Sequence, residues 1–108
     1  MHSKLTPHAL TDGATIAVDW NQSVNQTVTV AGNRTLTFSN PIAGETYTIT
    51  ITQDATGSRL ITWPSTVKWA SGSAPTLTTT AARTDQVTLY FTGTHYLDVS
   101  IKKDFNLA

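Results

Sequence analysis

Acidic side chains are the first candidates for chemistry, because two carboxylates that flank a cleft can hydrolyse a glycosidic bond. The acids of this chain are scattered, each at an expected strand end or turn: Asp12, Asp19, Glu45, Asp54, Asp85, Asp98 and Asp104. Asp12 and Asp54 stand among turn-forming residues, where a carboxylate bonds its own backbone. No pair of acids is indicated, so we predict no catalytic residue and no enzyme.

Metal and cofactor sites are not indicated either. The histidines are His2, His8 and His95, and no two of them have the spacing of a helical zinc motif. The chain contains no cysteine. Residues 54–58 (DATGS) lack the alternating acids of a calcium loop, and no glycine-rich loop opens a helix that would hold a phosphate. We therefore expect no metal and no cofactor.

Two of the three tryptophans fall in one stretch, residues 59–72 (RLITWPSTVKWASG). Exposed indole rings in such a stretch would suit stacking against a sugar, whereas buried rings would fill a small core. Trp63 follows Ile61 at a spacing of two, so both side chains point to the same side of the strand. Trp69 follows Val67 at the same spacing, so these two also share a side. We interpret Trp63, Trp69 and Trp20 as core aromatics and keep the sugar-stacking platform as the alternative.

The elements that would position these residues are strands, because apolar residues alternate with threonine along most of the chain. Turn clusters rich in glycine, proline and asparagine separate the runs. Residues 48–63 read as a hairpin whose tip is Gly57, a residue free to take a positive φ. The pattern predicts an all-β, antiparallel β-sandwich, jelly-roll-like, with roughly seven to nine short strands.

The inward face of these strands is predicted by the alternation. Its members are Ile16, Val18, Trp20, Val28, Val30, Leu36, Phe38, Tyr47, Ile49, Ile51, Val87, Leu89, Phe91, Leu97, Val99 and Ile101.

Composition limits the classes of partner. Charged residues make up 13% of the 108 residues, about half the usual share, and the net charge is zero. A neutral surface is not suited to nucleic acid or to an anionic membrane, and no run approaches the length of a membrane span. A surface of Thr, Ser, Asn and Gln has little self-repulsion, so it favours packing against copies of itself or a larger body.

Three regions are expected: an N-terminal arm (residues 1–13), a β-sandwich domain (14–101) and a C-terminal tail (102–108). The two end segments are either frayed or docked on a neighbouring subunit. Docking would account for the apolar residues that they contain, namely Leu5, Leu10, Phe105 and Leu107.

Four linked elements occur in order along the chain: GNRTL at 32–36, QDATGSR at 53–59, WPSTVKW at 63–69 and APTLTT at 74–79. Together they resemble a β-sandwich module of tailed-bacteriophage virion structural proteins, found in capsid decorations and in tail-fibre-associated appendages. The resemblance covers about residues 14–101. Leu60 departs from it, because a threonine-like outward residue is expected there.

The resemblance implies a virion component that forms a homotrimer and has no chemistry of its own. We therefore predict a structural protein, either a capsid decoration or a small surface appendage, that docks on major capsid or tail proteins. A chain with no room for a fibre shaft favours this prediction, whether as a decoration or as an appendage. The alternative is a receptor-binding or glycan-binding module of a tail fibre, with a host surface glycan as partner. Candidate interface residues are Leu5, Leu10, Leu60, Phe105 and Leu107.

Overall fold

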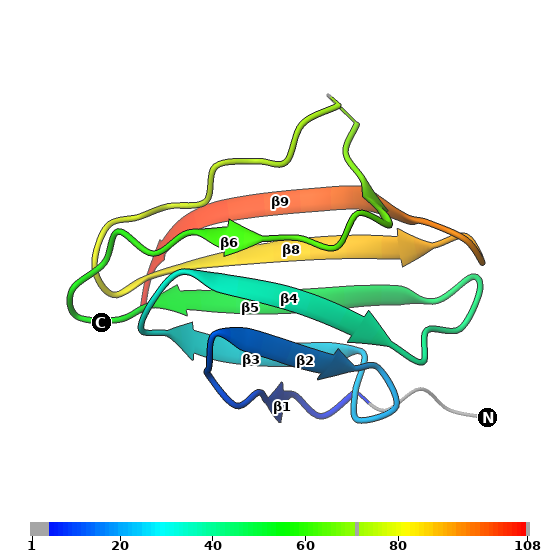
Figure 1. Ribbon diagram of the computed structural model, residues 1–108, viewed down its shortest axis with the longest axis horizontal. Helices are drawn as coiled ribbons and strands as arrows, with labels where there is room; N and C mark the ends of the chain where they lie inside the picture. The colour runs from blue at the N-terminus through cyan, green and yellow to red at the C-terminus, as the bar shows by residue number, and fades with distance from the viewer. Residues whose placement is uncertain (1–4, 71, 108) are drawn as a thin grey trace.

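The computed structural model describes residues 5–70 and 72–107, which form strands and connecting turns (Figure 1). No part of this described chain is a helix of the length and apolarity that a membrane span needs. The strands are β1 (His8–Ala9), β2 (Thr15–Asp19), β3 (Asn25–Val30), β4 (Arg34–Ser39), β5 (Thr46–Gln53), β6 (Ile61–Thr62), β7 (Val67–Lys68), β8 (Arg83–Phe91) and β9 (Tyr96–Asn106).

The strands form two sheets that enclose one core. Sheet A has the order β1-β3-β5-β8-β9-β7, and sheet B has the order β2-β4-β6. Sheet B lies in front of sheet A in Figure 1. The all-β class predicted from the alternation is confirmed.

The first six strands alternate between the two sheets. Strands β1, β3 and β5 pair in parallel in sheet A, while β2, β4 and β6 pair in parallel in sheet B. The chain therefore winds around the core in three coils, each of which contributes one strand to each sheet. The antiparallel strands β8 and β9 then extend sheet A beyond the third coil.

The predicted antiparallel pairing is wrong for most of the structure. Of the seven strand pairs that the described residues form, only β5–β8 and β8–β9 are antiparallel. The predicted hairpin over residues 48–63 is also wrong, because β5 belongs to sheet A and β6 to sheet B. Alternation identifies the faces of a strand but not its neighbours, and here each crossover between parallel strands is a strand of the opposite sheet.

The core contains most of the residues that the alternation places inward. Ile16, Val18, Val30, Ile49, Val87 and Leu89 are fully buried, and together they come from both sheets. Phe38, Phe91 and Ile101 are partly buried and pack against this core.

Strand β9 is the exception to the inward pattern. Leu97 is 42% exposed and Val99 is 59% exposed, so their predicted inward positions are wrong. The register between β8 and β9 shifts beyond Thr88, and the shift places Asp98 rather than an apolar residue opposite Leu89. A bulge of this kind reverses the side on which the following residues point.

Both end segments contain strand residues. His8 and Ala9 form β1, which pairs with β3, and β9 continues without interruption to Asn106. The fold therefore includes parts of what composition alone assigned to an arm and a tail.

Candidate binding surfaces

The three coils turn from sheet A to sheet B at one corner of the molecule, at the left of Figure 1. The guanidinium of Arg34 donates two hydrogen bonds to Asp12, from Nε to Oδ1 at 2.7 Å and from Nη2 to Oδ2 at 2.8 Å. These bonds join the second coil to the first. Hydrogen bonding from Arg34 lowers the pKa of the Asp12 carboxyl below its usual value.

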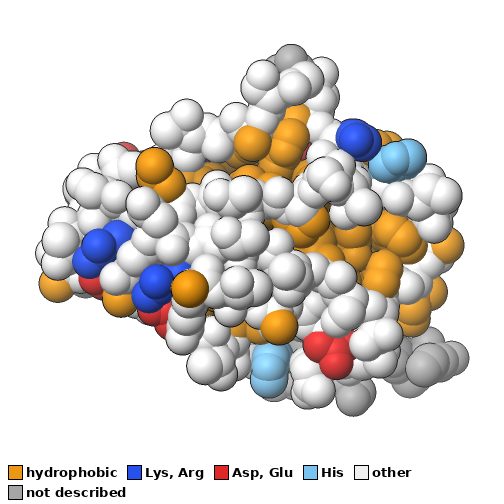
Figure 2. Space-filling model, in the orientation of Figure 1, with side chains coloured by type: hydrophobic (Ala, Val, Ile, Leu, Met, Phe, Trp, Pro, Cys, Tyr) orange, Lys and Arg blue, Asp and Glu red, His pale blue; other side chains and the backbone are white. Residues whose placement is uncertain are grey.

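A second arginine–aspartate pair closes the corner of the third coil. Arg59 donates to Asp54 from Nη2 at 2.9 Å, and the backbone N–H of Gly57 donates to the same carboxylate. The Arg59 bond, followed by the Gly57 bond, lowers the pKa of Asp54 to about 2. Figure 2 shows adjoining basic and acidic side chains at this corner.

Hydrogen bonds to the backbone join the corner of the second coil to that of the third. The N–H of Leu60 donates to Asn33 Oδ1 at 2.9 Å, and the N–H of Arg34 donates to the Leu60 carbonyl at 2.9 Å. A Cβ atom on Gly32 would lie 2.5 Å from Arg34 Nη1, so glycine leaves room for the guanidinium. The GNRTL and QDATGSR elements therefore build the corner, while the Leu60 side chain projects from it, 56% exposed.

An aromatic cluster fills the space between the two sheets. Trp20 is 4% exposed and stacks on Tyr47 with ring centroids 4.3 Å apart. Phe38 lies beside Trp20, and its ring also meets Tyr96 edge-on at 4.9 Å. Burial raises the pKa of Tyr96 to about 12.

Trp63 and Trp69 lie at the open side of this cluster. Their rings meet edge to face at 5.3 Å, and both are only partly buried. Strand β6 is two residues long, so sheet B stops short of this side and leaves part of the cluster uncovered. Figure 2 shows hydrophobic side chains gathered over this part of the face. Trp63 Nε1 is buried and makes no hydrogen bond within the described structure, so its polar edge points into the protein.

A second apolar surface lies at the end of the molecule where the β4–β5 and β8–β9 turns meet. We call it the turn-end patch, and its residues are Ile42, Tyr90, Leu97 and Val99, all exposed. Gly44 in the first turn donates its N–H to the Phe91 carbonyl, which holds the two turns together. The alternation along β8 does turn Tyr90 outward, but the bulge that exposes the β9 members has no signal in sequence spacing.

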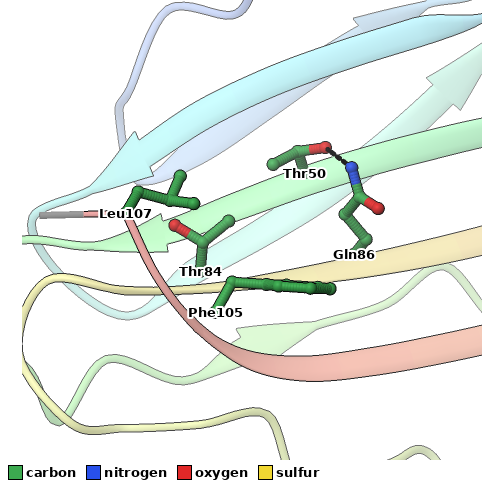
Figure 3. A pocket seen from close by; sticks show the side chains of 5 residues that line it. All are labelled: Thr50, Thr84, Gln86, Phe105 and Leu107. Carbon is green, nitrogen blue, oxygen red and sulfur yellow. Dashed lines mark hydrogen bonds between the residues drawn. The ribbon is translucent and has the colours of Figure 1, made fainter.

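The outer face of sheet A carries an open hollow of about 150 Å³ at its other end (Figure 3). Its lining residues are Thr50, Thr84, Gln86, Phe105 and Leu107. Two of these, Phe105 and Leu107, are candidate interface residues from the sequence. Leu5 and Leu60 are also exposed, whereas Leu10 packs against the core.

The acidic side chains do not gather into a site. Within residues 5–70 and 72–107, no three acidic or histidine side chains are placed to hold a metal ion. Asp85 is buried at 2% exposure, where it accepts hydrogen bonds from the N–H groups of Thr78 and Asp104. The Asp85 carboxylate therefore holds the backbone of Thr78 and Asp104 in place, which is a structural role.

The sequence of the chain matches a protein family described as "Putative phage tail fibre C-terminal domain" over residues 6–96. The chain belongs to this family. This tail fibre domain is accordingly a virion component, as the resemblance implied, and its role is structural and related to the tail fibre. No significant match was found among curated proteins or among solved structures.

Proposed function

We propose that this tail fibre domain is a non-enzymatic structural module that associates with copies of itself through the turn-end patch. Its four large apolar side chains are exposed, Tyr90 and Leu97 stand opposite one another in the β8–β9 register, and the Gly44–Phe91 bond brings the turn that carries Ile42 to the same end. Apolar side chains that cluster on the surface of a soluble protein mark interaction sites. The family supports a place in the tail fibre in preference to capsid decoration.

The rest of the surface is compatible with such an assembly. The chain has seven basic and seven acidic residues, and three of each take part in the ion pairs that the described residues form. Copies of the domain therefore approach one another without strong repulsion. We propose a homotrimer, in which an interface on each subunit adds buried area that a small domain lacks.

Sedimentation velocity on the full chain tests the assembly. We expect a species of three times the 11.6 kDa chain mass, and we expect Leu97→Asp to shift the population toward monomer. Leu60→Asp is the matched control, because Leu60 is exposed at 56% against 42% for Leu97 but lies at the opposite corner. A wild-type monomer at all concentrations, or dissociation by Leu60→Asp alone, would overturn the proposal.

A second candidate function is binding of a host receptor or surface glycan. The tryptophan pair gives it little support, because Trp63 directs its N–H inward and both rings pack against the core. The hollow on sheet A supports it better, because it combines an aromatic ring with polar side chains.

A further inference from the structure

The hollow of Figure 3 is formed by side chains on the outer face of three neighbouring strands. Thr50 lies on β5, Thr84 and Gln86 lie on β8, and Phe105 lies on β9. In the register, Thr50 stands opposite Gln86, and Thr84 stands opposite Phe105. Thr84 and Tyr90 are six residues apart on β8, so the hollow lies roughly 20 Å from the turn-end patch.

A bulge in β9 sets the position of the aromatic ring. The β8–β9 register shifts between Thr84 and Gln86, and Asp104 takes a positive φ of 68° at this point. The buried Asp85 carboxylate accepts the Asp104 N–H at 2.8 Å and so holds the bulge. Phe105 follows directly, and its placement is therefore determined by the fold.

The ring and the polar groups face one another across the hollow. Figure 3 shows the Phe105 ring edge-on beneath Thr84 and Gln86, with one ring face turned toward them. Gln86 Nε2 donates to Thr50 Oγ1 at 3.1 Å, which orients the amide. Its second N–H and its carbonyl oxygen remain for a ligand.

Charged side chains stand beside the hollow without lining it, and Lys102 is the one opposite Gln86 in the β8–β9 register. None of its lining residues is charged. Arg83 pairs with Asp104 at 3.1 Å, and Lys103 donates to the Thr76 carbonyl at 3.0 Å. A neutral ligand with both apolar and hydroxyl surface therefore fits this lining better than an ion does.

We propose that the hollow binds one neutral pyranose, the terminal sugar of a surface polysaccharide. The apolar face of the sugar ring would stack on Phe105 and contact Leu107, while its hydroxyls would bond to the amide of Gln86. Thr84 is buried and its hydroxyl pairs with that of Thr52, so it shapes the floor of the hollow. The hollow, about 150 Å³ in volume and open to solvent, leaves room for one six-membered ring against Phe105. Because the site is shallow, the affinity of one copy is in the millimolar range, and the several copies of a fibre raise it by avidity.

The test is a titration of the full isotope-labelled chain with methyl glucoside, methyl galactoside and methyl mannoside, followed by NMR. We expect at least one of them to shift the amide signals of Gln86 and Phe105. Gln86→Ala and Phe105→Ala should each weaken binding about tenfold. Leu97→Asp is the matched control and should leave the sugar affinity unchanged while it alters self-association.

Three results would overturn this site. One is the absence of shifts with all three sugars, and another is shifts confined to the indole signals of Trp63 and Trp69. The third is a shift of the Gln86 and Phe105 signals on dilution without sugar, which would assign the hollow to a second copy of the chain. Failure of the sedimentation test leaves this inference intact, since the two use different ends of sheet A.

Discussion

Gly57 occupies a backbone position that no other residue type fits. Its φ is +74°, and an added Cβ would lie 2.6 Å from the Thr79 carbonyl oxygen and 2.8 Å from the Ala81 nitrogen. Both neighbours are backbone atoms, so neither can turn aside as a side chain would. The glycine thus lets the corner of the third coil pack against the segment that precedes β8.

Gly57→Ala should therefore destabilise the domain by about 2–4 kcal/mol, through backbone strain and this close approach. Gly44→Ala provides the matched control, because Gly44 has φ +88° but no atom within 4 Å of the added Cβ. It should cost only about 1 kcal/mol. Urea unfolding of the three proteins measures the difference, and equal losses for both variants would contradict the packing argument.

At the scale of strands, the sequence predicted which side chains point inward better than it predicted which strands pair with one another. Threonine alternation placed Tyr47, Ile49 and Ile51 inward on β5, because burial of one face imposes a period of two. The same alternation is compatible with a parallel or an antiparallel neighbour, so the three coils were not foreseen. The open hollow could not be foreseen either, because it depends on a bulge that spacing does not reveal.

Asp85 links two elements that are distant in sequence. Its carboxylate joins the loop before β8 to the bulge of β9, through the N–H groups of Thr78 and Asp104. An asparagine there would present an amide N–H₂ to one of these donors and leave it unsatisfied in a buried position.

Asp85→Asn should lower the free energy of unfolding by about 2–3 kcal/mol. Asp19→Asn makes the same change at a partly exposed carboxylate that also accepts hydrogen bonds, and it should lower the free energy of unfolding much less. Chemical denaturation provides the comparison. Equal stability of Asp85→Asn and wild type would mean that the bulge does not need the carboxylate.

For the molecule as a whole, the two arginine–aspartate pairs at the corner make the stability of the fold depend on pH. The three coils meet where Asp12 pairs with Arg34 and Asp54 pairs with Arg59. Both carboxyl pKa values are lower in the folded protein than the ordinary value, that of Asp54 at about 2. The unfolded chain therefore binds protons first as the pH falls, and this binding favours unfolding.

The contribution of Asp54 is complete above the ordinary aspartate pKa of about 4, and it is lost as the pH falls through about 2. Asp54→Asn should therefore be less stable than wild type at neutral pH, and the difference should narrow across this window. Unfolding midpoints of Asp54→Asn and wild type, measured between neutral pH and about pH 2, test this prediction. Parallel curves for Asp54→Asn and wild type would mean that the Asp54–Arg59 pair does not stabilise the folded chain.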